Sequence, residues 1–292
     1  MAKVTKAVIP AAGLGTRVLP ATKSIPKEML PIVDRPAIHY IVEEAVRSGI
    51  TDILIITSRN KVNVEDYFDR APELEERLLA AGKREVYDEI VSIAHMANIQ
   101  YVRQKETKGL GHAVLCAKSF VGNEPFAVLY GDDVIISPPD KPATGELCAA
   151  YEKYGKGVVG IKEVSPQAIL KYSSLSVTPL EDRIFAVHDM IEKPAPDQVL
   201  SLYSILGRCV LPPEIFDILE QTPPGAGGEI QLTDAMKTLT RCGGMTGVDY
   251  TGTRYDMGNK LGVMQAAVEV ALNHPEIGND FREYLKNIAK TL

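Results

Sequence analysis

The chain has 292 residues, of which 45% are hydrophobic and 24% charged, and its formal net charge at pH 7 is -6. This composition excludes a disordered or fibrous protein, and the acidic balance argues against nucleic acid or an anionic membrane as a partner. No apolar run is long enough to span a bilayer, and the first residues indicate a short strand instead of a signal peptide, so we expect a cytoplasmic protein.

The first 135 residues predict strands that alternate with helices. Residues 4–9 predict a short buried strand, followed by a glycine-rich loop and, after Pro36, an amphipathic helix through Arg47 that stops at Gly49. Further strands are predicted at 52–57, 98–103 and 126–130, and a further helix at 109–119. Continuous apolar runs suit parallel strands covered on both faces, so we expect a doubly wound α/β fold with ligands at the carboxyl ends of the strands.

Residues 61–96 interrupt this alternation. They are strongly charged, with leucine and isoleucine at helical spacing. The pattern predicts a helical insertion packed on the sheet, and its residues indicate no chemistry.

From about residue 156 the pattern changes to shorter β segments with helices between them. Strands are predicted at 156–164, 173–178, 183–191 and 204–211, and a helix near 229–241. The C-terminal stretch predicts two helices broken at His274-Pro275, which cap the core or pair with another subunit. No repeat or linker separates the halves, so we expect one domain over 1–292.

The cysteines and histidines show no metal-ligand spacing. We expect free, buried thiols at Cys116, Cys148, Cys209 and Cys242, which form no CxxC pair. The histidines form no HExxH motif, so catalysis is expected to rest on other groups.

The loop after the first predicted strand has the sequence Ala11-Ala12-Gly13-Leu14-Gly15-Thr16-Arg17. Glycines let backbone N–H groups approach phosphate oxygens, and Arg17 and Lys27 can neutralise a triphosphate. A tight turn with solvated basic residues is the alternative for so short a motif. The spacing fits neither a Walker A loop nor the dinucleotide fingerprint, which needs a third small residue where Val18 stands.

The longer stretch GLGTRVLPATKSIPKEMLP resembles the signature of the sugar nucleotidyltransferases, GxGTR followed by PKxxxP. The blocks GLGHAVLCA, GDD, EKP and GEIQLTD extend this resemblance over essentially the whole chain and are most similar to the uridylyltransferases of the family. The resemblance implies a Rossmann-like, mixed and mostly parallel sheet flanked by helices, of the glycosyltransferase A-like type. It implies a nucleotide-binding core at 1–135, and a sugar-binding and C-terminal helical region at 136–292.

The same resemblance implies an enzyme that uses Mg²⁺ to transfer uridylate from UTP to glucose 1-phosphate, giving UDP-glucose and pyrophosphate. It also implies a homodimer or homotetramer. Nucleotide contacts are implied for Ala11, Ala12, Gly13, Gly15, Thr16, Arg17 and Lys27. Gln104 and Gly109 are implied as base contacts, with Glu28 a weaker candidate. An amide such as that of Gln104 both donates and accepts, although it could instead cap a loop, and we expect His112 to be an ordinary residue of a helix's first turn.

Gly131-Asp132-Asp133 closes the most hydrophobic predicted strand. Two carboxylates at the ligand edge of a sheet are costly without cations, so we expect Mg²⁺ there, with a Gly-Asp surface turn as the alternative. The resemblance implies Asp132 and Asp256 as metal ligands and places Asp133 near the sugar.

Glu192-Lys193-Pro194 follows a predicted strand. The resemblance implies that Glu192 binds sugar hydroxyls and that Lys193 binds the phosphate of the sugar 1-phosphate, whereas the residues alone favour an exposed ion pair. Ser173 stands where the family commonly has a glycine that approaches the glucose, which puts this sugar contact in question. Glu229 is expected in the first turn of a helix that forms part of the site wall.

Glucose 1-phosphate is mostly dianionic at neutral pH, because its second pKa is about 6, so its attack on UTP needs no general base. We expect catalysis to rest on charge neutralisation by Arg17, Lys27, Lys193 and the metal held at Asp132. A thymidylyltransferase, an enzyme for another sugar or base, and a non-catalytic regulatory relative remain alternatives. The presence of every charged residue of the motifs favours an enzyme, and Ser173 is the one feature that favours the regulatory relative.

Overall fold

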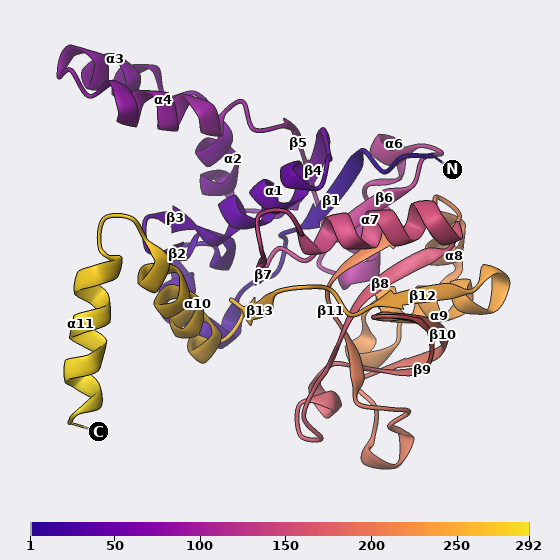
Figure 1. Ribbon diagram of the computed structural model, residues 1–292. Coiled ribbons are helices and arrows are strands. Elements are labelled where there is room, and N and C mark those ends of the chain that lie inside the picture. Colours follow the sequence, from indigo (N-terminus) through magenta and orange to yellow (C-terminus); the bar gives the residue numbers. More distant parts are fainter. Residues whose placement is uncertain (1, 292) are drawn as a thin grey trace.

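Within residues 2–291, which the computed structural model describes, a sheet of nine strands runs through the molecule in the order β5-β4-β1-β6-β11-β8-β12-β10-β9 (Figure 1). Its first half is formed by β1 (Lys6–Pro10), β4 (Asp52–Thr57), β5 (Asn98–Arg103) and β6 (Phe126–Leu129). Its second half is formed by β8 (Gly157–Glu163), β9 (Ser173–Glu181), β10 (Ile184–Glu192), β11 (Tyr203–Leu211) and β12 (Met245–Val248).

The strands of the first half are parallel. β1 pairs with β4 and β6, and β4 pairs with β5. β1 and β4 are continuous apolar runs because helices cover both faces of the sheet there. β6 then pairs antiparallel with β11, so the sheet is mixed. The carboxyl ends of β1, β4, β5 and β6 therefore meet at one edge, where a ligand site is expected.

An apolar core lies on each face of the sheet. One core includes residues of α1 (Ala37–Arg47), α2 (Val62–Phe68), α7 (Ala143–Tyr154) and α10 (Lys260–Asn273). The other includes residues of α5 (Leu110–Leu115), α6 (Lys118–Val121), α8 (Ile215–Gln221) and α9 (Leu232–Gly243). This arrangement confirms an α/β fold with a mixed sheet flanked by helices.

A short ribbon closes the ligand edge. β7 (Asp133–Ile136) pairs antiparallel with β13 (Thr253–Asp256), in a register that sets Asp133 opposite Asp256. Two acids from distant parts of the chain thus become neighbours. A second ribbon joins β2 (Pro31–Ile32) to β3 (Arg35–Pro36) just before α1.

The predicted insertion at 61–96 is helical, but most of it does not pack on the sheet. Only α2 contributes buried apolar side chains, Val64 and Phe68. α3 (Pro72–Ala80) and α4 (Arg84–Ile93) contact each other and project from the body of the molecule (Figure 1). The charge of this segment thus reflects its exposure on several sides.

Two helix predictions also need correction. The helix expected at 109–119 is divided into α5 and α6, and the helix expected near 229–241 begins only at Leu232. Glu229 therefore precedes α9 in extended backbone and is not in its first turn. The break between α10 and α11 (Gly278–Ala289) falls at His274-Pro275, as predicted.

The cysteines are free thiols, and Cys148 and Cys209 are buried as expected. Cys116 is half-buried and Cys242 is exposed, so the expectation of burial was wrong for Cys242. Among residues 2–291, no helix has the length and apolar character that a membrane span requires.

Candidate active site

A cavity of about 440 Å³ opens at the edge where the parallel strands end. Of the residues predicted to bind nucleotide, it is lined by Ala12, Gly13, Gly15, Thr16, Lys27, Gln104 and Gly109. Asp132 also lines it, three residues after the end of β6. Further lining residues that the motifs did not single out as ligand contacts are Leu14, Thr107, Leu110, Tyr130 and Glu229. The structure therefore brings most of the predicted nucleotide residues to one hollow.

The glycine-rich loop wraps around the side chain of Lys27. Gly15 has a φ of +68°, and a Cβ at that position would lie 3.3 Å from the Lys27 Cβ. Thr22 Oγ1 donates to the Gly15 carbonyl at 2.7 Å and fixes the turn. Ala11 is buried at the start of the loop, where its N–H donates to Ile56 O at 2.8 Å. Gly15 is thus needed both for its left-handed backbone and for close packing.

Gln104 also lines the cavity and is 5% exposed. Its Nε2 donates to Gly109 O at 3.1 Å and to His112 Nδ1 at 2.9 Å. Gly109 has a φ of +100°, and a Cβ there would lie 2.7 Å from the Glu229 Cβ. Gln104 is therefore held in a fixed orientation, and His112 has a contact that its place in the sequence did not predict.

Glu28 lies beneath the loop and is fully buried. Its Oε2 is 2.8 Å from Lys61 Nζ. This weaker base candidate is therefore in a buried ion pair and is not among the residues that line the cavity.

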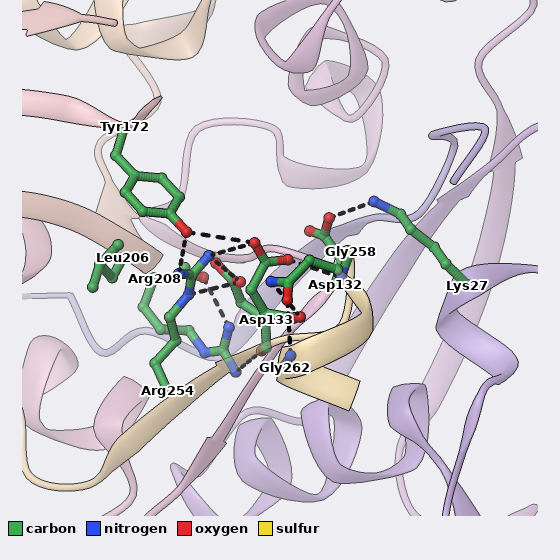
Figure 2. A network of polar contacts seen from close by, with 12 residues as sticks. Lys27, Asp132, Asp133, Tyr172, Leu206, Arg208, Arg254, Gly258 and Gly262 are labelled. Carbon is green, nitrogen blue, oxygen red and sulfur yellow. Dashed lines mark hydrogen bonds and ion pairs between the residues drawn. The ribbon is translucent and has the colours of Figure 1, made fainter. Parts of the chain in front are cut away.

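The predicted metal acids Asp132 and Asp256 lie together with two of the predicted phosphate-binding cations, Arg17 and Lys27. Figure 2 shows Lys27 beside Asp132. Lys27 Nζ donates to Asp132 Oδ2. Arg17 Nη1 lies 3.6 Å from Asp256 Oδ2, and its Nη2 lies 4.0 Å from Asp132 Oδ2. A Cβ on Gly258 would lie 2.8 Å from Asp256 Oδ1 and 3.0 Å from Asp132 Oδ2, so only glycine lets these groups meet.

The charges of this cluster stabilise one another. Burial lowers the pKa of Lys27, but the charges of Asp132, Glu28 and Asp133 and the hydrogen bond to Asp132 together outweigh it, so the pKa is raised. Burial likewise opposes ionisation of Asp132, yet Lys27 holds the pKa of that carboxyl below its usual value. Both groups are therefore charged at neutral pH.

Asp132 and Asp256 fit a divalent cation that also binds substrate. Within residues 2–291, no group of three or more His, Cys, Asp or Glu side chains is arranged to hold a metal alone. Mg²⁺ typically binds through one or two carboxylates together with substrate phosphates and water. Two converging acids beside cations that suit phosphate match that type of site.

Asp133 faces away from the cations of the loop and is 3% exposed. Arg254 donates to its Oδ1 from Nε at 2.8 Å, and Arg254 Nη2 lies 2.6 Å from the same oxygen. The Arg254 guanidinium stacks over the Tyr172 ring at 5.0 Å and donates to the Tyr172 hydroxyl at 3.1 Å. Figure 2 shows these three side chains grouped beside the acids. The motifs missed Arg254 and Tyr172, although Tyr172 directly precedes Ser173 and Arg254 lies two residues before Asp256.

The predicted sugar residues lie at the paired ends of β9 and β10, where Ser173 is opposite Glu192. Thr233 Oγ1 donates to Glu192 Oε2 at 2.8 Å, and burial raises the pKa of Glu192. Ser173 is 3% exposed, and its Oγ accepts from Ile205 N–H at 3.1 Å. The Ser173 hydroxyl is thus used within the sheet.

Lys193 has a φ of +47°, an unusual conformation for a residue with a side chain. Its N–H donates to Tyr172 O at 2.8 Å, which helps to hold this backbone. Such strain is concentrated at functional sites. This backbone conformation of Lys193 could not be predicted from the sequence.

Residues 6–271 match a protein-family model described as Nucleotidyl transferase. The chain belongs to this nucleotidyl transferase family. A relative named UTP–glucose-1-phosphate uridylyltransferase YngB, from Bacillus subtilis (strain 168), is 51% identical to it over 288 residues, covering 99% of this chain and 96% of the relative. The family resemblance inferred from the motifs is therefore confirmed.

Solved structures agree with the family assignment and the fold. A UTP-bound UGPase from Acinetobacter baumannii superposes on this nucleotidyl transferase with a TM-score of 0.90 at 39% identity, covering 97% of this chain and 98% of the other. A UDP-glucose pyrophosphorylase complexed with UDP-glucose gives a TM-score of 0.82 at 42% identity, covering 90% of this chain and 97% of the other.

Proposed function

We propose that this nucleotidyl transferase transfers uridylate from UTP to glucose 1-phosphate, giving UDP-glucose and pyrophosphate. The observation that carries the proposal is the convergence of Arg17, Lys27, Asp132 and Asp256 beside a cavity that is lined by Lys27, Asp132 and Gln104. Relatives with this name are about half identical to the chain over nearly its full length.

The triphosphate binds along the glycine-rich loop, with the base toward Gln104 and Gly109. Both hydrogens of the Gln104 amide are used by Gly109 and His112, so its oxygen is the group that accepts from the base. The N3–H of uracil satisfies that oxygen, whereas cytosine has no hydrogen at N3. Thymine presents the same N3–H, so selection against thymidylate must come from the 5-methyl group or the ribose.

The sugar phosphate binds beside the nucleotide, on the segments that carry Ser173, Glu192 and Lys193. Glu192 accepts from sugar hydroxyls, and Lys193 neutralises the phosphate. Ser173 contributes its backbone, since its hydroxyl is used by Ile205 N–H. Asp133 orients this region through Arg254 and Tyr172. In this arrangement residues 1–135 bind the nucleotide and residues 136–292 supply the sugar site and the C-terminal helices.

A phosphate oxygen of the dianionic sugar phosphate attacks the α-phosphorus of UTP, and pyrophosphate leaves. Mg²⁺ held by Asp132 and Asp256 supplies positive charge to the phosphate oxygens when it is bound. Arg17 and Lys27, which pair with these acids in the free protein, then turn to the triphosphate. Neutralisation and positioning thus replace a general base.

We also infer a cytoplasmic homo-oligomer. The free thiols suit a reducing compartment, as do the phosphorylated substrates. α11 has one buried residue, Gly278, and the α3–α4 hairpin exposes Leu74 and Leu79, so both offer apolar surface to another subunit.

The function is tested by mixing the purified protein with Mg²⁺, glucose 1-phosphate and, in turn, UTP, dTTP, CTP, ATP and GTP, and measuring pyrophosphate release. We expect UTP to give the fastest release and CTP almost none. Faster release with dTTP would assign the chain as a thymidylyltransferase. No release with any pairing would support a non-catalytic, regulatory relative.

A further inference from the structure

Lys61 is a buried lysine outside every motif used above. It immediately precedes α2, on the segment that follows β4, and it is 6% exposed. Its Nζ donates to Glu28 Oε2 at 2.8 Å and also to the main-chain carbonyl of Ala11. One ammonium group therefore joins three segments that are distant in sequence.

The two segments that Lys61 contacts are both part of the proposed triphosphate site. Ala11 begins the glycine-rich loop, and Glu28 directly follows Lys27 in the 3₁₀ turn Lys27–Met29. A Cβ on Gly13 would lie 3.4 Å from Lys27 Nζ, so the loop and the Lys27 side chain are in close contact. A shift of either segment would therefore change where Lys27 lies relative to the loop.

Stability alone is a poor reason for this buried pair. Glu28 is fully buried, and its Oε1 has no hydrogen-bond partner among residues 2–291. Burial lowers the pKa of Lys61 and raises that of Glu28, so the desolvation cost outweighs their mutual attraction in both groups. Buried ion pairs of this kind are often no more stabilising than apolar residues of the same volume.

We propose that Lys61 is a positioning residue that fixes the glycine-rich loop against the Lys27 turn and so preorganises the site for the β- and γ-phosphates. This inference rests on the proposed use of UTP. The role is indirect, because Lys61 lies beneath the loop and reaches the site only through Ala11 and Glu28. It predicts a selective effect on ligands that carry those two phosphates.

The test uses the double variant Lys61→Met/Glu28→Gln, which removes both charges together and leaves no unpaired buried ion. We expect kcat/KM for UTP to fall by about a hundredfold, the effect typical of a misplacement near 1 Å. Calorimetry should show a clear loss of affinity for UTP, whereas affinity for UMP, which has only the α-phosphate, should stay close to wild type. The KM for glucose 1-phosphate should not change.

The single variant Glu28→Gln keeps an acceptor for Lys61 and should lose less UTP affinity than the double variant, so it provides a second measurement if the double variant folds poorly. Glu75→Gln removes a buried acid of α3, which pairs with Arg70 away from the cavity, and this variant should leave both affinities unchanged. A folded double variant with wild-type kcat/KM, or with equal losses for UTP and UMP, would overturn the proposal. Failure of the wild-type protein to use UTP would instead overturn the proposed function.

Discussion

At the scale of single residues, we propose that Lys27 and Arg17 bind two partners in turn, first the acids Asp132 and Asp256 and then the triphosphate. In the free protein Lys27 is paired with Asp132, and Arg17 lies between Asp132 and Asp256. The pairing of Lys27 with Asp132 raises the pKa of the lysine and lowers that of the carboxyl, so both are charged before any ligand arrives. Lys27 and Arg17 would be free to bind phosphate when Asp132 and Asp256 hold a divalent cation, so we expect the metal and the nucleotide each to strengthen binding of the other.

The variant Lys27→Met should lower kcat about a hundred- to a thousandfold, as the loss of one preorganised electrostatic contact typically does. Steady-state pyrophosphate release measures the effect. Lys23→Met is the matched control, because Lys23 is an exposed lysine of the same loop and should retain wild-type turnover. Equal losses in the two variants would mean that Lys27 acts only through the general charge of the loop.

Arg254 is the partner that makes a buried Asp133 tolerable. Burial raises the pKa of Asp133 to about 6 in spite of the Arg254 charge. Arg254→Met should lower the free energy of unfolding at pH 7.5 by about 3–5 kcal/mol, because it leaves a buried charge unpaired. The deficit should be smaller at pH 5, since a raised pKa means that the carboxyl is protonated there and needs no cation.

Urea denaturation of wild type and variant at the two pH values measures this effect of Arg254. Asp133→Asn combined with Arg254→Met should recover most of the loss at pH 7.5. A deficit that does not change between pH 7.5 and pH 5 would show that packing on Tyr172, and not the Asp133 charge, accounts for it.

At the scale of elements, a buried ion pair between Glu44 and Arg208 joins α1 to β11. Glu44 and Arg208 are 2% and 1% exposed, and Arg208 Nη2 lies 2.7 Å from Glu44 Oε2. Glu44 also accepts from the Thr144 N–H at 3.0 Å on α7, and Arg208 donates to Asp133 O at 2.9 Å. The pair thus connects two helices and a strand to the start of β7.

Arg208→Met should lower the free energy of unfolding by about 3–5 kcal/mol, since it leaves the Glu44 carboxylate buried without its cation. The double variant Glu44→Leu/Arg208→Met should regain much of that loss, because apolar groups of similar volume often replace a buried pair at little cost. Chemical denaturation of the three proteins measures both steps. A single variant within about 0.5 kcal/mol of wild type, the range of surface substitutions, would contradict this role.

A strand is predicted best when its own residues are enough to identify it, without knowledge of the elements that pack on it. β4 and β5 have the predicted bounds, 52–57 and 98–103. The insertion was misplaced because an amphipathic pattern shows that a helix has an apolar face but not what that face packs on. The apolar faces of α3 and α4 pack largely against each other.

Those residues of the site that belong to sequence motifs could be predicted. Glycines and acids that follow strands can be assigned to the ligand edge, and the structure brings Gly13, Gln104 and Asp132 to one cavity. The contacts of Arg254 and Lys61 were not predictable, because they depend on the β7–β13 register and on loops that approach only in the folded chain. Neither residue belongs to a motif whose spacing could indicate its partner.

At the scale of the whole molecule, apolar side chains remain exposed on helices that project from the body. In Figure 1 the α3–α4 hairpin and α11 extend away from the central sheet. Leu261 and Met264 on α10 are 67% and 61% exposed, and Tyr284 on α11 is 59% exposed. Surface of this kind on a folded protein indicates contact with another protein, and a second copy of the chain is the simplest partner.

We therefore expect the purified protein to form a dimer or tetramer, with α10 in the interface. The double variant Leu261→Glu/Met264→Glu should lower the mass measured by light scattering during gel filtration, because charges in an apolar contact are desolvated without partners. Leu180→Glu, at a residue 51% exposed at the end of β9, is the control and should leave the mass unchanged. Circular dichroism should be the same for all three proteins, so that a change of mass reports association and not unfolding. A wild-type protein with the mass of one chain at micromolar concentration would contradict the expectation, and a fall in mass with Leu180→Glu would move the interface to the β9–β10 edge.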